Sequence, residues 1–374
     1  MNLFIILFTI CLIVFSKSNL EAAKNGLLLW ANNVVPSLFP FLIAVSLLQY
    51  TNLIYYLSKY MKKIIKLLFN VPSSAVFPFI MGLLSGYPVG AKIVSDMYDK
   101  KYFSKEQAEQ ILAYTNNSGP LFIIGTVGLS FFNNSKVGYL LYLTHILSAI
   151  SVGIYFGFKT RFKNFNFMIR KKFFSYIFNI KNLFYKFNTN ADCISNKNYN
   201  QNKKLQGNYI KGSDNNFYNE YVIEKQSENS IKNISSILTE SIISSIKTIL
   251  LIGGFVTLFS VIISILQSTK ILLIISQILE NILNKDSNLI NSFLQGTIEI
   301  TNGIKNISAL DINDLKIKVL ASSFILGFGG ISVLLQVVGI TSKKNLSCRK
   351  YFIGKILQGF FATFYTYLFY NLFI

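Results

Sequence analysis

The sequence predicts an all-α membrane protein, a polytopic helix bundle built from two inverted repeats that each contain a re-entrant hairpin broken by glycine. Three observations lead to this fold class. Hydrophobic residues occupy 52% of the 374 positions, which is more apolar surface than a soluble domain of this size can bury. Apolar runs close to the length of a spanning helix recur along the chain. Glycine, proline and polar residues interrupt several of these runs.

The apolar runs predict seven spanning helices, because each approaches the roughly 20 residues needed to cross a bilayer. The first run lacks a basic start and an A-x-A cleavage site. It therefore favours an uncleaved anchor helix within residues 1–25 over a signal peptide. The seven runs are 3–16, 27–48, 119–132, 137–158, 249–266, 319–340 and 351–374.

Three short motifs recur in the same order in the two halves of the chain. The first pair is S-L-L-Q-Y-T-N-L-I and S-I-L-Q-S-T-K-I-L, the second is a pair of glycine-bounded breaks that end in Gly-apolar-Lys, and the third begins with Leu-Ala in both halves. Recurrence in register indicates a duplicated unit. The matched segments are 46–54 with 264–272, 82–92 with 296–305, and 112–119 with 320–327.

Each predicted unit contains three crossings, an interfacial amphipathic helix and a hairpin that does not need to cross. Three is odd, so the second unit begins on the opposite face of the membrane and the two units form an inverted repeat. We place the first repeat at 26–158 and the second at 236–374, with a linker at 159–235 between them.

The formal charge of +20 follows the predicted topology. Basic residues gather in the loops that this topology places on one side, which the positive-inside rule makes cytoplasmic. The N-terminus is then inside and the C-terminus outside, and nucleic acid is not an expected partner. The basic linker at 159–235 is either a tether between the repeats or a segment whose first part lies on anionic lipid.

The stretch G-L-L-S-G-Y-P-V-G-A-K at 82–92 predicts half of a binding site. Irregular backbone in hydrocarbon survives only where protein or a water-filled cavity surrounds it. A half-helix beginning near Gly90 would direct its N–H groups and positive dipole end into that cavity, and Lys92 would add a full charge. Such a site suits an anion, with Ser85 and Gly86 beside it.

The stretch T-N-N-S-G-P at 115–120 supplies the neutral part of the predicted site. Asn116 and Asn117 can hydrogen-bond a substrate, and Ser118 can cap the helix that follows Gly119. The alternative is that this stretch is simply a capped helix start after a surface loop.

The second half supplies the remaining candidates. Glu299, with Thr301, Asn302 and Lys305, occupies the matching break, and a buried carboxylate there suggests binding of a coupling ion or a proton relay. A structural ion pair between Glu299 and Lys305 is the alternative. The run G-F-G-G-I-S ends at Ser332 and places a hydroxyl in a spanning segment, although helix packing also explains its glycines.

No enzyme, metal site or cofactor is expected. The three cysteines are far apart, and His145 is the single histidine. The G-L-L-S-G run has one residue too many for an intramembrane serine protease signature, so His145 is interpreted as a packed or interfacial residue. A phosphate-binding loop and an H-E-x-x-H motif are both missing from the sequence.

Two motifs together resemble a known family. P-F-I-M-G-L-L-S-G-Y-P-V-G-A-K, followed by N-N-S-G-P-L-F-I-I-G-T-V-G, is similar to the sporulation integral membrane proteins of the YlbJ type, which belong to the wider group with a nucleoside-recognition or Gate domain. The resemblance covers nearly the whole chain, except that the linker at 159–235 does not align. It implies a fold related to concentrative nucleoside transporters and a role in sporulation. It also implies movement of dipicolinate, a small aromatic dicarboxylate, toward the spore.

The sequence and the resemblance together predict a transporter of a small organic anion that works by alternating access, and the resemblance implies that this anion is dipicolinate. It would reside in the bacterial cell membrane or in a membrane around the spore, in contact with lipid, with homo-oligomers or spore-envelope proteins as further partners. Two alternatives stay open. One is a nontransporting membrane scaffold for spore assembly, and the other is a nucleoside carrier.

Overall fold

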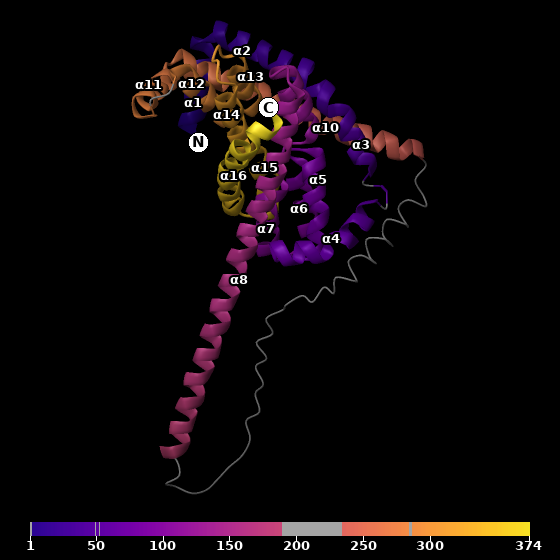
Figure 1. Cartoon of the computed structure of the whole chain (residues 1–374), viewed down its shortest axis with the longest axis vertical. Helices are drawn as coiled ribbons and strands as arrows, with labels where there is room; N and C mark the ends of the chain where they lie inside the picture. Colours follow the sequence, from indigo (N-terminus) through magenta and orange to yellow (C-terminus); the bar gives the residue numbers. More distant parts are fainter. Residues whose placement is uncertain (1, 49, 52, 189–233, 284–285) are drawn as a thin grey trace.

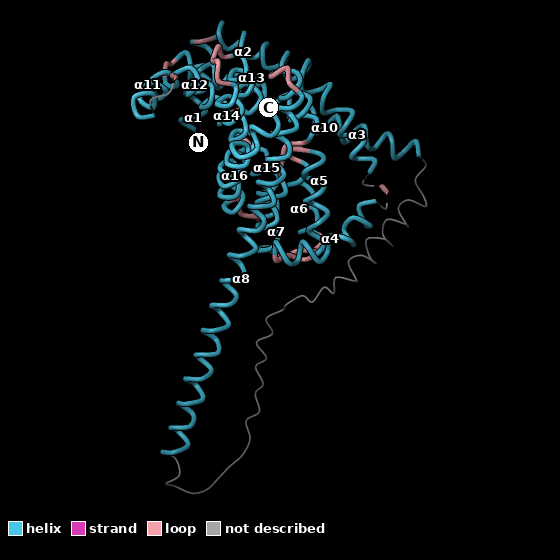
Figure 2. Tube along the Cα trace, in the orientation of Figure 1, coloured by secondary structure: helices cyan, strands magenta, loops and turns pink. Residues whose placement is uncertain are grey.

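The computed structural model describes residues 2–48, 50–51, 53–188, 234–283 and 286–374, and within these ranges it contains helices and no strand. Helices pack into one bundle, and the C-terminal part of the long helix α8 projects away from it (Figure 1). Figure 2 shows that most connections between the bundle helices are short loops. The all-α prediction is confirmed.

The first half of the chain runs from an N-terminal pair of helices to the long helix α8. A π-helical segment, η1, joins α2 to α3, and a hairpin of two short helices, α5 and α6, precedes α7. The elements are α1 (Asn2–Val14), α2 (Ser16–Leu29), η1 (Trp30–Val34), α3 (Val35–Leu48), α4 (Leu53–Phe69), η2 (Ser73–Ala75), α5 (Val76–Ser85), α6 (Val89–Asp99), α7 (Lys105–Thr115), η3 (Leu121–Phe131) and α8 (Ser135–Asn188).

The second half repeats the order of elements from α3 onward. A long apolar helix is followed by a shorter amphipathic one, a hairpin of two short helices, a further helix, a break, an apolar segment and a final helix. The two halves therefore share one order of elements, and the inverted repeat stays a prediction. The elements are α10 (Ile234–Ser268), α11 (Ile271–Leu283), α12 (Ser287–Ile298), α13 (Ile300–Ala309), α14 (Leu315–Phe328), α15 (Gly330–Thr341), η4 (Ser342–Lys344) and α16 (Arg349–Phe373).

Fewer helices are long and apolar enough to span a membrane than the seven expected. Among the described residues three segments qualify, 135–162, 234–268 and 315–344, or up to five if two helix pairs bent by 98° and 102° each count as one span. Helix breaks and polar residues together explain the difference. The run at 119–132 folds into η3, which has only 11 residues. The run at 351–374 folds into α16, which is diluted by polar residues.

Glycines allow the arms of both hairpins to pack closely. A Cβ atom added to Gly82 would lie 1.6 Å from the Thr115 carbonyl oxygen, and one added to Gly90 would lie 2.4 Å from the same atom. In the second hairpin, a Cβ on Gly303 would lie 2.0 Å from the Cα of Gly296. Real Cβ atoms do not approach so closely, so glycine is required at these contacts. Both predicted hairpins are therefore present, as α5–α6 and α12–α13.

Helix α8 has 54 residues, about 80 Å at 1.5 Å per residue, which is far more than a bilayer requires. The predicted start of the linker at residue 159 falls inside this helix, which continues through Asn188. The remainder of the predicted linker, 189–233, lies outside the described residues.

Candidate functional site

A cavity lies where the tips of the two hairpins meet the two helix breaks. It encloses about 540 Å³ of empty space, part of it open to the outside. Its walls come from α3 and α10, from both hairpin tips, and from the residues around both breaks. The lining residues among the predicted site are Ser85, Gly86, Ser118, Gly119, Glu299, Thr301 and Ser332. Residues from the two halves of the chain therefore line one cavity.

The tip of the first hairpin packs directly against the first helix break. Gly86 has a φ of +81°, in the region that favours glycine, and a Cβ added to it would lie 3.0 Å from the Gly119 nitrogen. The neighbouring Ser85 hydroxyl is buried and makes no hydrogen bond. Across the cavity, the Gln336 side-chain oxygen is also buried without a partner. Buried polar atoms are rarely left unsatisfied, so these two mark the cavity as a place for a polar ligand.

Asn116 and Asn117 are buried but contact protein rather than the cavity. The Asn116 amide nitrogen donates to the Tyr351 hydroxyl at 3.0 Å, and its oxygen accepts from the Ala91 N–H at 3.4 Å. The Asn117 oxygen accepts from the Gln358 amide at 2.8 Å. Both asparagines thus hold the break against α6 and α16, which leaves their predicted contact with substrate without support from their positions.

Ser118 does not cap the helix after the break. The N-cap position of η3 is Pro120, and no side chain caps that helix. The Ser118 hydroxyl is buried near the Tyr87 phenol. Its backbone N–H donates to His145 Nε2 at 3.2 Å, and His145 is 1% exposed. His145 is therefore a packed residue, as interpreted from the sequence.

Glu299 is the N-cap of α13 in the second hairpin. Its carboxylate accepts from the Asn302 N–H at 2.7 Å and from the Thr301 hydroxyl at 3.0 Å. The side chain of Asn302 reaches α10, where its amide donates to the Ser260 hydroxyl at 2.7 Å. Lys305 is exposed, and within the described ranges no ion pair joins it to Glu299. The carboxylate thus occupies the positive end of α13, where it competes with any anion for the N–H groups of that helix.

The two predicted lysines do not meet in the cavity. Lys92 is exposed and lines a second, more polar cleft with Asp96, next to Ser244, Ser245 and Thr248 of α10. This cleft shares one wall residue, Ser85, with the central cavity. Gly90 serves the packing against Thr115 described above and lines neither space. Glu299 is thus the one charged side chain among the described residues that line the cavity.

The comparisons with known proteins agree with the motifs. Residues 31–158, which include the first hairpin and break, match the family described as "Gate: Nucleoside recognition". The chain is 30% identical over 368 residues to the sporulation integral membrane protein YlbJ of Bacillus subtilis (strain 168), which covers 98% of this chain and 81% of that protein. The chain belongs to the YlbJ family. No solved structure matches it.

Membership in the YlbJ family confirms the resemblance read from 78–92 and 116–128, and the Bacillus subtilis relative is described as an integral membrane protein of sporulation. The apolar helices fit this location. Within the described ranges, no cluster of three His, Cys, Asp or Glu side chains is suited to a metal ion.

Several residues of this YlbJ-family site were missed by the sequence analysis. Tyr87 and Gln336 line the cavity, and so do Phe122 and Phe255. Lys355 is buried in α16, where its ammonium lies 3.4 Å from the Tyr87 hydroxyl. Lys355 could have been found, because an ionisable residue inside an apolar run is itself a signal of function.

Proposed function

We propose that this YlbJ-family protein is a carrier that moves a small aromatic organic anion toward the developing spore, by alternating access around the central cavity. Dipicolinate is the substrate that the family resemblance implies. One observation carries the proposal: two broken hairpins and two helix breaks converge on one cavity lined by buried polar groups. Irregular backbone at membrane depth is tolerated where it lines a cavity, and carriers place substrate sites there.

The chemistry of the lining supports a small aromatic substrate. Phe122 and Phe255 offer ring faces, while Ser332 and Gln336 offer a hydroxyl and an amide. Ser332 lies in the first turn of α15, a helix whose N-terminus has no side-chain cap. The positive dipole end of α15 therefore remains available to a carboxylate.

Glu299 constrains the mechanism, because an ionised carboxylate repels an anion in the same cavity. We therefore propose that Glu299 is protonated when substrate is bound, so that a proton travels with the anion. The Thr301 hydroxyl and the Asn302 N–H hold the carboxyl group at the hairpin tip, where it can gain and lose that proton as the hairpin moves. Glu299 is then the coupling residue.

The second cleft gives the proposed route into the cavity. Lys92 stands in its wall and would attract an anion, and the hydroxyls of Ser244, Ser245 and Thr248 would replace part of its hydration. Ser85 belongs to both spaces and would form the barrier between them.

A nucleoside carrier is the second candidate, favoured by the charge of the cavity. Its one charged lining group among the described residues is a carboxylate, and its other polar groups are neutral. A nucleoside is uncharged and could hydrogen-bond Glu299 and Gln336 while its base contacts a phenylalanine ring. The matched family description also names nucleoside recognition.

The deciding experiment measures dipicolinate in spores and in mother cells of a strain that lacks this gene, complemented with the intact chain or with the Glu299→Gln variant. We expect depleted spores and accumulation in the mother cell without the gene, and recovery with the intact chain alone. Normal spore content without the gene would overturn the dipicolinate proposal. If nucleosides block substrate uptake into proteoliposomes and dipicolinate does not, this result would favour the nucleoside carrier.

A chain whose linker at 189–233 is replaced by a Gly/Ser segment separates a carrier from a scaffold. A carrier should retain most of its transport, because the hairpins and the cavity are unchanged. Full loss of function in this variant, with wild-type amounts in the membrane, would favour the scaffold.

A further inference from the structure

One face of α16 carries a row of polar side chains that contacts the first half of the chain. Tyr351, Lys355 and Gln358 are spaced at i, i+4 and i+7, so they share one side of the helix. Tyr351 accepts from Asn116 and Gln358 donates to Asn117, both in the first helix break. Lys355 lies between them, facing the tip of the first hairpin at Tyr87.

Lys355 is a fully buried lysine surrounded by neutral groups. It is 1% exposed, and its ammonium donates to the Gln358 side-chain oxygen at 2.7 Å and to the Tyr87 hydroxyl at 3.4 Å. The ammonium also lies 5.1 Å from the centre of the Tyr87 ring and 5.8 Å from that of Tyr351. Within the described ranges it forms no ion pair. A buried charge of this kind is strongly unfavourable unless a partner or a ligand compensates it.

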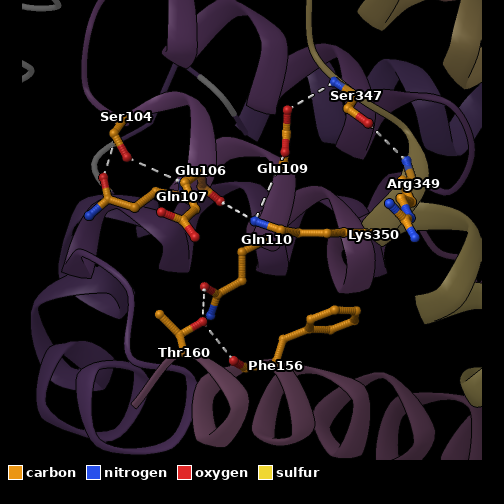
Figure 3. A network of polar contacts seen from close by, with 10 residues as sticks. All are labelled: Ser104, Glu106, Gln107, Glu109, Gln110, Phe156, Thr160, Ser347, Arg349 and Lys350. Atoms are coloured by element: carbon orange, nitrogen blue, oxygen red, sulfur yellow. Dashed lines mark hydrogen bonds and ion pairs between the residues drawn. The ribbon is translucent and has the colours of Figure 1, made fainter. Parts of the chain in front are cut away.

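Another lysine of the same helix has an acidic partner. Lys350, near the start of α16, has its ammonium 3.9 Å from a Glu109 carboxylate oxygen and 3.0 Å from the Glu106 carbonyl oxygen (Figure 3). Figure 3 also shows the Ser347 N–H donating to Glu109, which fixes this end of α16 on α7. The outer lysine thus has an acid partner, whereas the costlier inner lysine has none among the described residues.

Tyr87 connects the Lys355 ammonium to the cavity. Tyr87 lines the cavity, and its hydroxyl accepts from Lys355 while donating to the Leu326 carbonyl oxygen at 3.2 Å. An anionic group bound beside Tyr87 would lie within several ångströms of the ammonium. At that range, in a medium of low polarity, a unit charge changes binding by tenfold or more.

We propose that Lys355 is the residue that makes this carrier select anions. Its charge lies behind Tyr87, and the carboxylate of the substrate supplies the negative charge that Lys355 lacks. This inference rests on the proposed function and specifies the side chain that recognises the substrate charge. It also assigns the role that Lys92 and Lys305 were predicted to share, since both of those lysines are exposed, whereas Lys355 is buried against Tyr87, which lines the cavity.

The test compares two ligands of one shape and different charge. Purified full-length protein is titrated with dipicolinate and with pyridine-2,6-dicarboxamide, its neutral analogue. We expect the intact chain to prefer the dianion. Lys355→Met should lower affinity for the dianion by about tenfold or more and change affinity for the dicarboxamide less than about twofold. Lys355→Arg should retain the preference, and the control Lys350→Met should leave both affinities unchanged.

The outcomes separate this inference from the proposed function. Unchanged preference in Lys355→Met would overturn the role of Lys355 and leave the carrier proposal standing. Failure of the intact chain to bind either ligand would overturn both. If Lys355→Met does not yield monodisperse protein, Lys355→Gln replaces it, because a glutamine keeps a hydrogen-bond donor toward Tyr87 and Gln358 while removing the charge.

Discussion

The two junctions between hairpin tip and helix break differ in how they are held. In the first half, side chains that are far apart in the sequence hold the junction together. The asparagines of the break hydrogen-bond to Tyr351 and Gln358 of α16, and the Tyr87 hydroxyl accepts from Lys355. In the second half, local backbone features dominate. Glu299 caps its own helix by accepting hydrogen bonds from the Thr301 hydroxyl and the Asn302 N–H, and the break that follows α14 is formed by glycines.

The glycine break of the second half uses conformations that other residues adopt only with strain. Gly329 and Gly330 have φ values of +87° and +70°. All six prolines of the chain lie in the first half, so the second break is made without one. The comparison shows that the same order of elements can be held in two ways. The first junction depends on hydrogen bonds between residues far apart in the sequence, and the second depends on a turn formed by its own glycines. The first should be the more sensitive to distant substitutions.

The largest effect is expected where both halves depend on glycine. Gly82→Ala and Gly303→Ala should each abolish recovery of folded protein, because the added methyl group would overlap backbone atoms at 1.6 and 2.0 Å. Gly339→Ala is the control, since nothing lies within 4 Å of its added Cβ, and it should be neutral or slightly stabilising. The yield of monodisperse protein in detergent measures this. Folded Gly82→Ala protein would show that the hairpin can move away from α7.

An intermediate effect should distinguish the two junctions. Tyr351→Phe removes the acceptor of the buried Asn116 amide and should cost about 1–3 kcal/mol of stability. Glu299→Ala removes a helix cap and should cost about 0.5–2 kcal/mol. Thermal unfolding of both variants in the same detergent gives the ranking. A larger loss of stability for Glu299→Ala than for Tyr351→Phe would contradict the prediction that the first junction contributes more stability than the second.

The smallest effect is expected at the exposed lysines. Lys92→Ala should slow anion transport by about twofold to fivefold without loss of folded protein, because it lowers the local concentration of anion at the cleft. Lys305→Ala, its counterpart by sequence, should transport normally, since its side chain is exposed and lines no described cavity. Initial rates in proteoliposomes at two salt concentrations measure both. Normal rates in Lys92→Ala would remove the cleft from the route.

Local sequence predicted the parts of the site that are coded locally. The glycine spacing in 82–92 located the first hairpin, with α6 beginning at Val89 close to the expected Gly90. The break around Glu299 located the second hairpin. Glycine and proline act on their own backbone, so their positions can be read without knowing the fold.

The partners of the polar residues could not be read in the same way. Asn116 was expected to face substrate, but it bonds to Tyr351, which lies 235 positions away in the chain. No local pattern reports a contact of that range. Lys355 was counted as part of the apolar run at 351–374, because a single charged residue changes the overall apolar character of such a run very little. The number of spanning helices was overestimated partly for a related reason, because an apolar run such as 119–132 does not show where a helix breaks.

The π-helical turn η1 gives the protein a built-in optical reporter. Trp30 is its single tryptophan, and its indole N–H donates to the Ile249 carbonyl oxygen of α10 at 3.0 Å. The ring also packs on Gly253, where an added Cβ would lie 2.6 Å away. Val34, one turn further, lines the cavity. Indole emission from the unmodified chain therefore comes from one site beside the cavity, and its colour and quenching will register any separation of α10 from η1.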